Sequence, residues 1–234
     1  MNQFDYNILL YLNHITQHSP ILTKVFLQIY DNDMKTGLFV ALLWWAWFDA
    51  GDIAHRHEIH EKVVAGILGS LVCIVVVRLM LVLLPFRPRP MTVPMYGLNF
   101  QMPAEGWVAW SSFPSDHAAL FFLLTVCLFS VSRILGSIAL ADTIFLICLP
   151  RVVLGVHYPT DIVCGAFIGI AAGYLVLWKR VRVPISKPML QWMNAHPPSF
   201  YASAFLVTFL FAQVFWPVTQ IIIKLKRLVM VLIK

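Results

Sequence analysis

Residues 63–84 read VVAGILGSLVCIVVVRLMLVLL, an apolar stretch in which Arg78 is the only charged residue. A helix over this range rises about 33 Å, enough to cross the hydrocarbon core of a bilayer, which is about 30 Å thick. A helix that is apolar on every side has no polar face to turn to water, so it must be surrounded by lipid or by other helices. The stretch therefore predicts a transmembrane helix.

Further apolar runs lie on both sides of this one. Over the whole chain of 234 residues, 60% are hydrophobic and 12% are charged, whereas soluble domains are closer to half apolar and one quarter charged. We therefore predict an all-α polytopic membrane protein with about six transmembrane helices. We expect one membrane-embedded domain over residues 1–234. The further runs are residues 34–48, 117–134, 137–155, 161–178 and 200–223.

The first thirty residues mix apolar and polar side chains. Apolar residues recur there at the three- and four-residue spacing of one helix face. This pattern predicts an N-terminal amphipathic helix that lies in the membrane interface and does not span it. The apolar positions are Ile8, Leu9, Leu12 and Ile15.

Three glycines repeat every four residues in the run 161–178, namely Gly165, Gly169 and Gly173. This spacing places them on one helix face, where the lack of a side chain lets a neighbouring helix approach closely. We expect helix packing at this face, with no ligand.

The formal net charge is +6, and most lysines and arginines lie at the ends of the apolar runs. Bases in such positions meet lipid headgroups or set membrane topology. Because no basic stripe with exposed aromatics is present, we expect membrane lipids as partners, and no nucleic acid. The bases divide almost evenly between the two membrane sides, which leaves the orientation open. The sequence does not indicate an oligomeric state.

One histidine-rich and acidic cluster lies between two apolar runs, and it contains His55, His57, Glu58, His60 and Glu61. A zinc-binding His-Glu-x-x-His motif needs a histidine four residues after the first. Glu61 occupies that position, so we expect a solvated loop here and no metal site.

Polar side chains gather at three other places, each beside an apolar run. Such residues are costly near a membrane and are functional candidates. Because successive spans alternate in direction, all three places fall on the same membrane side, and we expect them to converge. They are Arg78 with Arg87 and Arg89, Ser115 with Asp116 and His117, and Arg151 with His157 and Asp161.

The residue types in these clusters suit phosphoryl transfer. Arginine offers a planar set of donors that matches phosphate oxygens. Asp161 follows His157 by one helical turn, so its carboxylate can hold Nδ1 and leave the other ring nitrogen free to attack. His117 is placed to protonate the leaving oxygen, and the arginines would repel a metal ion. The phosphate-binding candidates are Arg78, Arg87, Arg89, Arg151, Ser115 at a helix N-cap, and the backbone N–H of Asp116.

The order and spacing of these motifs resemble the signature of the type 2 phosphatidate phosphatase superfamily, which includes lipid phosphate phosphatases, glucose-6-phosphatase and the vanadium haloperoxidases. Arg89-Pro90 fits its first motif, residues 114–117 fit the second, and Arg151, His157 and Asp161 fit the third with both spacings intact. The resemblance covers roughly residues 60–178, and it implies that these residues form the catalytic core of the domain. It implies that His157 forms a phosphohistidine with Asp161 in support, and that His117 protonates the leaving group. It also implies that Arg89, Arg151 and Ser115 bind the phosphoryl oxygens, without a metal or other cofactor.

The sequence departs from the family pattern at three positions. Val82 stands where the family has a lysine, Pro150 replaces a serine, and Asp116 replaces a glycine. Arg78, one turn before Val82, or Arg87 is expected to replace the lysine.

The stretch Ser-Phe-Pro-Ser-Asp-His, residues 112–117, looks like the bacterial undecaprenyl-diphosphate phosphatases of this superfamily. We therefore expect hydrolysis of a polyisoprenyl diphosphate, with the active site on the extracytoplasmic side of a bacterial inner membrane. The alternatives are a phosphatidate or phosphatidylglycerophosphate phosphatase and a lipid phosphotransferase. A non-catalytic lipid transporter or scaffold is the alternative from another class.

Overall fold

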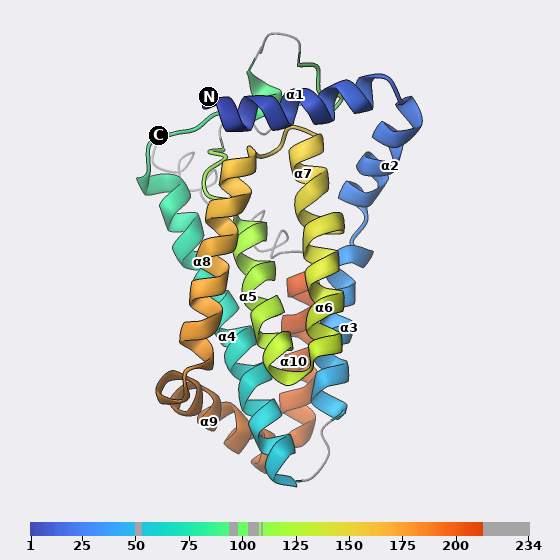
Figure 1. Ribbon diagram of the computed structural model, residues 1–234. Helices are drawn as coiled ribbons and strands as arrows, with labels where there is room; N and C mark the ends of the chain where they lie inside the picture. The colour runs from blue at the N-terminus through green and yellow to red at the C-terminus, as the bar shows by residue number, and fades with distance from the viewer. Residues whose placement is uncertain (50–52, 94–97, 103–107, 109, 213–234) are drawn as a thin grey trace, which may run out of the picture.

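The computed structural model describes residues 1–49, 53–93, 98–102, 108 and 110–212. In this part of the chain, helices run along a common direction and other helices cover both ends (Figure 1). The α-helices are α1 (Gln3–Gln17), α2 (Pro20–Asp31), α3 (Met34–Phe48), α4 (Ile53–Leu83), α5 (Asp116–Val131), α6 (Arg133–Ala141), α7 (Leu149–Val153), α8 (Pro159–Leu177), α9 (Lys179–Ala195) and α10 (Pro197–Ala212). A π-helical segment, Asp142–Cys148, joins α6 to α7, and a 3₁₀ turn covers Pro90–Thr92.

Within the described residues, three helices are long and apolar enough to cross a membrane, and three shorter ones are also apolar. The long ones are His55–Leu83, Arg133–Val153 and Pro159–Leu177, and the shorter ones are Met34–Phe48, Asp116–Val131 and Pro197–Phe211. The predicted all-α membrane bundle is therefore confirmed. The end of the apolar run 200–223 lies outside the described residues.

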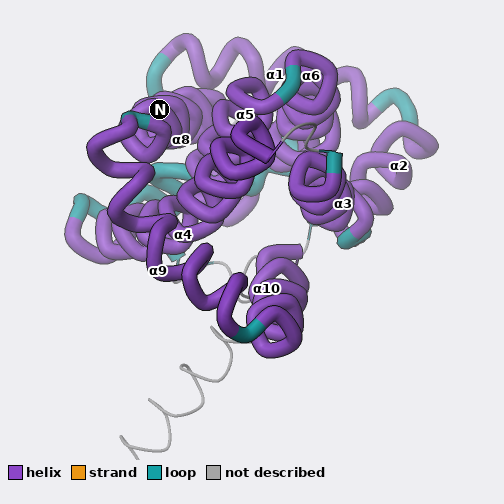
Figure 2. The backbone as a smooth tube through the Cα atoms, turned by 90° about the horizontal axis from the view of Figure 1, so that it is seen from below, coloured by secondary structure: helices purple, strands orange, loops and turns teal. Residues whose placement is uncertain are grey.

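Helix α5 lies at the centre of the bundle, as Figure 2 shows in a view along the helices. Its core-facing residues Ala118, Ala119 and Leu120 have no exposed surface. The glycines of α8 pack against it: a Cβ on Gly165 would lie 2.5 Å from the Ser115 carbonyl oxygen, and one on Gly169 would lie 2.2 Å from that of Ala119. The predicted close packing at this glycine face is thus observed, and it fixes the start of α5 against the start of α8.

The first thirty residues form two helices, and α1 lies across one end of the bundle (Figure 1). Leu9 is buried in a small apolar cluster with Val152 and Tyr158. The buried face of α1 also contains the polar residues Asp5 and Asn13. A polar residue on a buried face needs a protein partner, so α1 docks on the bundle through this face.

The histidine-rich cluster forms the first turns of α4, so the prediction of a loop there was wrong. Lys62 pairs with Glu58 at 3.1 Å, and His57 lies 3.4 Å from Glu61. Pairs of residues four apart stabilise a helix, and the adjoining apolar run continues the same helix into the membrane.

Helix α9 crosses the end of the bundle opposite α1, as the view from below shows (Figure 2). The sequence did not predict this helix, because Pro184 and Pro188 lie inside it and proline disfavours helix interiors. Packing against α4 stabilises it: Arg182 contacts Glu61 at 3.2 Å and Glu58 at 3.6 Å.

Candidate active site

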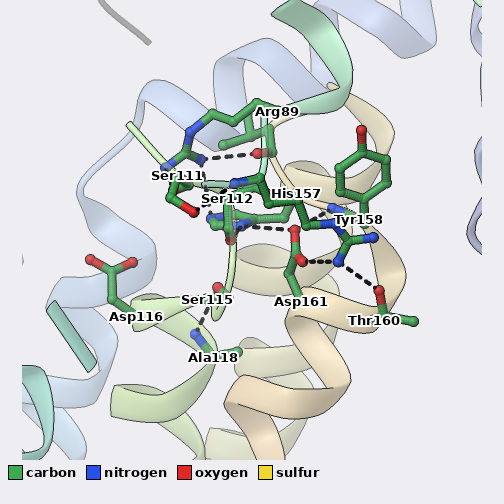
Figure 3. A network of polar contacts seen from close by, with 12 residues as sticks. Arg89, Ser111, Ser112, Ser115, Asp116, Ala118, His157, Tyr158, Thr160 and Asp161 are labelled. Carbon is green, nitrogen blue, oxygen red and sulfur yellow. Dashed lines mark hydrogen bonds and ion pairs between the residues drawn. The ribbon is translucent and has the colours of Figure 1, made fainter. Parts of the chain in front are cut away.

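Residues from the three polar clusters lie close together where α5 and α8 begin (Figure 3), at the end of the bundle that α1 crosses (Figure 1). The segment that follows α4 supplies Arg89, the N-terminus of α5 supplies Ser115, and the loop between α7 and α8 supplies His157. Each side chain lies at a helix end or in a connection, where backbone groups remain available for hydrogen bonding.

The loop that carries His157 turns sharply after α7. The Arg151 carbonyl oxygen accepts hydrogen bonds from the backbone N–H groups of Val156, at 2.8 Å, and His157, at 3.1 Å. Gly155 has a φ of +72°, a conformation that favours glycine. A Cβ at Gly155 would also lie 2.7 Å from the Phe100 ring. The glycine therefore lets the chain reverse and place His157 close behind Arg151.

The two ring nitrogens of His157 have different partners. Nδ1 lies 2.8 Å from the Ser112 carbonyl oxygen and 3.6 Å from Asp161 Oδ2. Because a carbonyl oxygen only accepts hydrogen bonds, Nδ1 carries the proton. The lone pair then lies on Nε2, which is 3.3 Å from Arg89 Nη1. Burial lowers the pKa of His157 from its ordinary value of 6.5; Asp161 opposes this shift and Arg89 adds to it.

The tautomer of His157 is therefore held first by a backbone carbonyl. The sequence pointed to Asp161 as the partner of Nδ1, and the structure gives Asp161 a longer contact. Asp161 is itself fixed by the Tyr158 backbone N–H, which donates to Oδ2 at 2.8 Å. The negative charge of Asp161 favours a positive charge on the His157 imidazole. The tautomer of His157 does not depend on Asp161 alone, because the Ser112 carbonyl oxygen also holds Nδ1.

Two buried arginines lie near this ring. Arg89 donates to the carbonyl oxygens of Val156 at 2.9 Å and Ser111 at 3.3 Å. Burial lowers the pKa of Arg89 and Asp116 opposes this shift, but a guanidinium remains charged at physiological pH.

Arg151, 4% exposed, donates to the Ile147 carbonyl oxygen at 2.5 Å. Its guanidinium lies 5.4 Å from the centre of the Tyr30 ring, so α2 also borders the cluster. Burial raises the pKa of the Tyr30 hydroxyl, which therefore stays protonated, and Arg151 opposes the shift. Sequence patterns gave no signal for Tyr30.

The N-terminus of α5 supplies Ser115 and the pair Asp116 and His117. Ser115 is fully buried and caps the helix, because its Oγ accepts from the Ala118 N–H at 3.3 Å. Its own N–H donates to the Asp161 carbonyl oxygen at 3.2 Å. Asp116 Oδ1 lies 2.8 Å from His117 Nδ1. Figure 3 shows Asp116 and Asp161 on opposite sides of Ser115, so each histidine has its own carboxylate.

Arg78 lies on the Asp116 side of the site. Its Nε is 3.8 Å from Asp116 Oδ2. Val82, where the resemblance places a lysine, is 78% exposed and faces out of the bundle. Arg78, one turn earlier on α4, instead contacts the first residue of α5.

A model of the PAP2 superfamily matches residues 63–184, which is more than half of the chain. The chain belongs to the PAP2 superfamily. The resemblance predicted from the motif spacing is thereby confirmed. The matched region contains Arg89, Ser115, His117, His157 and Asp161.

The chain is also similar to two known proteins. Bacitracin transport permease protein BcrC of Bacillus licheniformis is 34% identical over 80 residues, which are 34% of this chain and 39% of that protein. The aligned part thus spans about two fifths of the relative's length. The crystal structure of Aquifex aeolicus LpxE matches with a TM-score of 0.51 and 24% identity, over 74% of this chain and 93% of that chain. That match shows a shared fold.

Arg87 lies within the PAP2 region, but its partners are carboxylates. Its guanidinium contacts Asp161 Oδ1, lies 2.7 Å from Asp5 Oδ2 and donates to Thr160 Oγ1 at 2.9 Å. It also lies 4.0 Å from the centre of the Tyr158 ring. The sequence suggested a phosphate ligand here, whereas the geometry gives Arg87 a place behind Asp161.

Asp5 lies outside the region that the PAP2 model matches, and the sequence did not single it out. The available signal was its spacing: Asp5, Leu9 and Asn13 are four residues apart, so Asp5 lies on the same face as a core leucine. An acidic residue on a buried face indicates a charged partner.

The assembled site suits an anion. Guanidinium groups, the start of α5 and a neutral imidazole converge, and this set of donors is complementary to a phosphoryl group. Among the described residues, no three His, Cys, Asp or Glu side chains come together as a possible metal site.

Proposed function

We propose that this protein is a PAP2 membrane lipid phosphatase that converts a polyisoprenyl diphosphate, undecaprenyl diphosphate in particular, to its monophosphate. The observation that carries the proposal is the environment of His157. Its Nδ1 proton is held by the Ser112 carbonyl oxygen at 2.8 Å, and its Nε2 lies 3.3 Å from the Arg89 guanidinium. A lone pair beside an anion-binding donor is the geometry that attack on a bound phosphoryl group requires.

In the first step, Nε2 of His157 bonds to phosphorus while the bond from phosphorus to the leaving oxygen breaks. Arg89 and Arg151 hold the phosphoryl oxygens, and the positive charge that a metal would supply comes from their guanidinium groups. His117 donates its proton to the leaving oxygen. Asp116, 2.8 Å from His117 Nδ1, stabilises the charged imidazole before this transfer.

In the second step, water attacks the phosphohistidine. Neutral His117 accepts a proton from that water, the bond between phosphorus and Nε2 breaks, and inorganic phosphate leaves. His117 regains the proton that it lost in the first step, so the cycle closes without another reactant. Asp161, 3.6 Å from His157 Nδ1, stabilises the imidazole while it carries the phosphoryl group.

The position of Arg78 favours a diphosphate over a simple phosphate ester. The leaving group lies on the side of His117, and Arg78 pairs with Asp116 on that same side. The leaving group of a diphosphate is itself an anionic phosphate, which a guanidinium stabilises, whereas an ester releases an uncharged alcohol. The stretch at residues 112–117 supports the same substrate class, because it resembles the bacterial undecaprenyl-diphosphate phosphatases of this superfamily.

The proposed location is a bacterial inner membrane with the site on the extracytoplasmic side. Helix α9 lies at the opposite end of the bundle and contains Lys179, Arg180, Arg182 and Lys187 and no acidic residue. A cytoplasmic position for this basic segment agrees with the positive-inside tendency. Single cysteines at exposed positions of α9, labelled from outside intact cells, test this orientation; labelling of α9 would refute it.

A panel of lipid phosphates assayed with wild type and His157→Ala tests the activity. We expect wild type to release phosphate from undecaprenyl diphosphate in the presence of a chelator, faster than from phosphatidate or phosphatidylglycerophosphate. His157→Ala is expected to lose at least about 10³-fold, because no other group replaces a covalent nucleophile. Equal release by the two proteins would refute the proposal.

The same assay separates two alternatives. A phosphotransferase would move the phosphoryl group from the phosphohistidine to a second lipid and release no free phosphate. The Bacillus licheniformis relative is named as a bacitracin transport permease protein, and a transport protein would bind the lipid without turnover in either variant.

A further inference from the structure

The Asp5 carboxylate connects α1 to the start of α8. Asp5 has no exposed surface, and its oxygens accept hydrogen bonds from the Thr160 backbone N–H at 2.9 Å and from Thr160 Oγ1 at 2.7 Å. Oδ2 also lies 2.7 Å from Arg87 Nη2. A buried carboxylate with this many donors is held in one position.

Arg87 bridges two carboxylates that come from distant parts of the chain. One terminal nitrogen binds Asp5, and the other binds Asp161 Oδ1 and Thr160 Oγ1. The second oxygen of Asp161 faces His157 Nδ1 at 3.6 Å. A continuous series of contacts therefore runs from Asp5 through Arg87 and Asp161 to His157.

Charge balance shows what Asp5 adds to this series. Asp5, Arg87 and Asp161 carry a net charge of −1, because two carboxylates share one guanidinium. If Asp5 were neutral, Arg87 would offset the whole charge of Asp161. The imidazole of His157 becomes positive when Nε2 bonds to phosphorus, and a nearby negative charge that is already in place stabilises that state.

We propose that Asp5 of α1 is a positioning residue for phosphoryl transfer, which acts on His157 through Arg87 and Asp161. The inference rests on the function proposed above, and it makes the N-terminal helix a part of the active site. It also assigns Arg87 the task of orienting Asp161 in place of binding phosphate.

Other contacts show that α1 does not depend on Asp5 alone for docking. Asn13 donates to the Asn99 carbonyl oxygen at 2.8 Å and accepts from its N–H at 3.1 Å. Leu9 is buried against Val152 and Tyr158. A change at Asp5 that keeps its shape therefore leaves α1 in contact with the bundle, and Asn13 provides a matched control on the same buried face.

The experiment compares wild type, Asp5→Asn and Asn13→Ala, each as the full chain in detergent with undecaprenyl diphosphate as substrate. We expect Asp5→Asn to lower kcat about tenfold or more while KM stays within about twofold, because the reacting group loses support and substrate contacts remain. Asn13→Ala is expected to lower the melting temperature and to keep kcat within about twofold of wild type. Thr160→Val, which removes one hydroxyl shared by Asp5 and Arg87, should lower kcat in the same direction by less.

The double variant Asp5→Asn/Asp161→Asn separates a positioning role from a structural one. If Asp5 acts through Asp161, the double variant is no slower than Asp161→Asn, since the second change has nothing further to remove. Multiplicative losses, or an unchanged kcat in both Asp5→Asn and Thr160→Val, would overturn the inference. Either result would leave the proposed function intact if wild type is active and His157→Ala is not; an inactive wild type would remove both.

Discussion

Replacing Gly165 by alanine is expected to displace the first turn of α5, and with it Ser115. The glycine lies where α8 crosses the start of α5, and a Cβ there would lie 2.5 Å from the Ser115 carbonyl oxygen and 2.9 Å from Ala118 Cβ. Real Cβ atoms essentially never approach another atom closer than 3.0 Å. The nearest obstacle is backbone, so a side-chain rotation cannot relieve the contact.

The size of the displacement follows from these distances. To reach 3.0 Å the two helices must part by at least about 0.5 Å, and ordinary contact at 3.4 Å requires about 0.9 Å. A misplacement of about 1 Å costs roughly 10²-fold in rate, so we expect kcat/KM to fall about 10- to 100-fold. Overpacking also lowers the free energy of unfolding by about 1–3 kcal/mol.

Two other glycines supply the controls for this assay, in which phosphate release and thermal unfolding are measured in detergent. Gly37→Ala adds a Cβ with nothing within 4 Å and should leave rate and stability unchanged. Gly173→Ala crowds Val126 at 2.9 Å in the same interface, about two turns along α8 from Gly165 and about three turns along α5 from Ser115. It should lower stability with little loss of rate. A kcat/KM for Gly165→Ala within about twofold of wild type would refute the argument.

The contacts of His157 lead to two further predictions. Asp161→Asn should lower kcat by about 10²-fold. The loss is smaller than for a histidine whose tautomer depends on its carboxylate, because the Ser112 carbonyl oxygen still holds the Nδ1 proton of His157. A loss above about 10⁴-fold would contradict this role of Ser112. The pH profile of kcat/KM should show activity falling as His157 becomes protonated, at a pH below 6.5, because burial lowers its pKa. Arg89 lowers and Asp161 raises the pKa of His157. On the same substrate, Arg89→Gln should therefore move the midpoint of the acid limb to higher pH than in wild type, and Asp161→Asn should move it to lower pH. Shifts in the same direction would contradict the electrostatic account.

Much of the fold and the convergence of the clusters followed from simple regularities. Apolar runs define helices that alternate in direction, so motifs at the end of one run and the start of the next lie on the same side of the membrane. The spacing of Arg151, His157 and Asp161 is short enough for one turn and one loop to bring them together. The glycine repeat likewise indicated which face of α8 contacts a neighbour.

The remaining parts of the site depend on contacts over long distances in the chain. Asp5 bonds Thr160 across 155 residues and Arg87 across 82, and no local pattern encodes such pairs. The carbonyl oxygen of Ser112 holds His157 through the backbone, which any residue type would supply. Packing against α4 overrides the low helix propensity of two prolines in α9. These features follow from tertiary structure, which sequence spacing does not specify.

The most direct test of the central claim is to quench wild type milliseconds after mixing with undecaprenyl diphosphate, under alkaline conditions that preserve phosphohistidine, and to map the phosphate by mass spectrometry. We expect phosphate on Nε2 of His157 during the first turnover, and none on the enzyme in His157→Ala. A first turnover that proceeds with phosphate on a different residue, or with no phosphorylated enzyme at any quench time, would contradict the account.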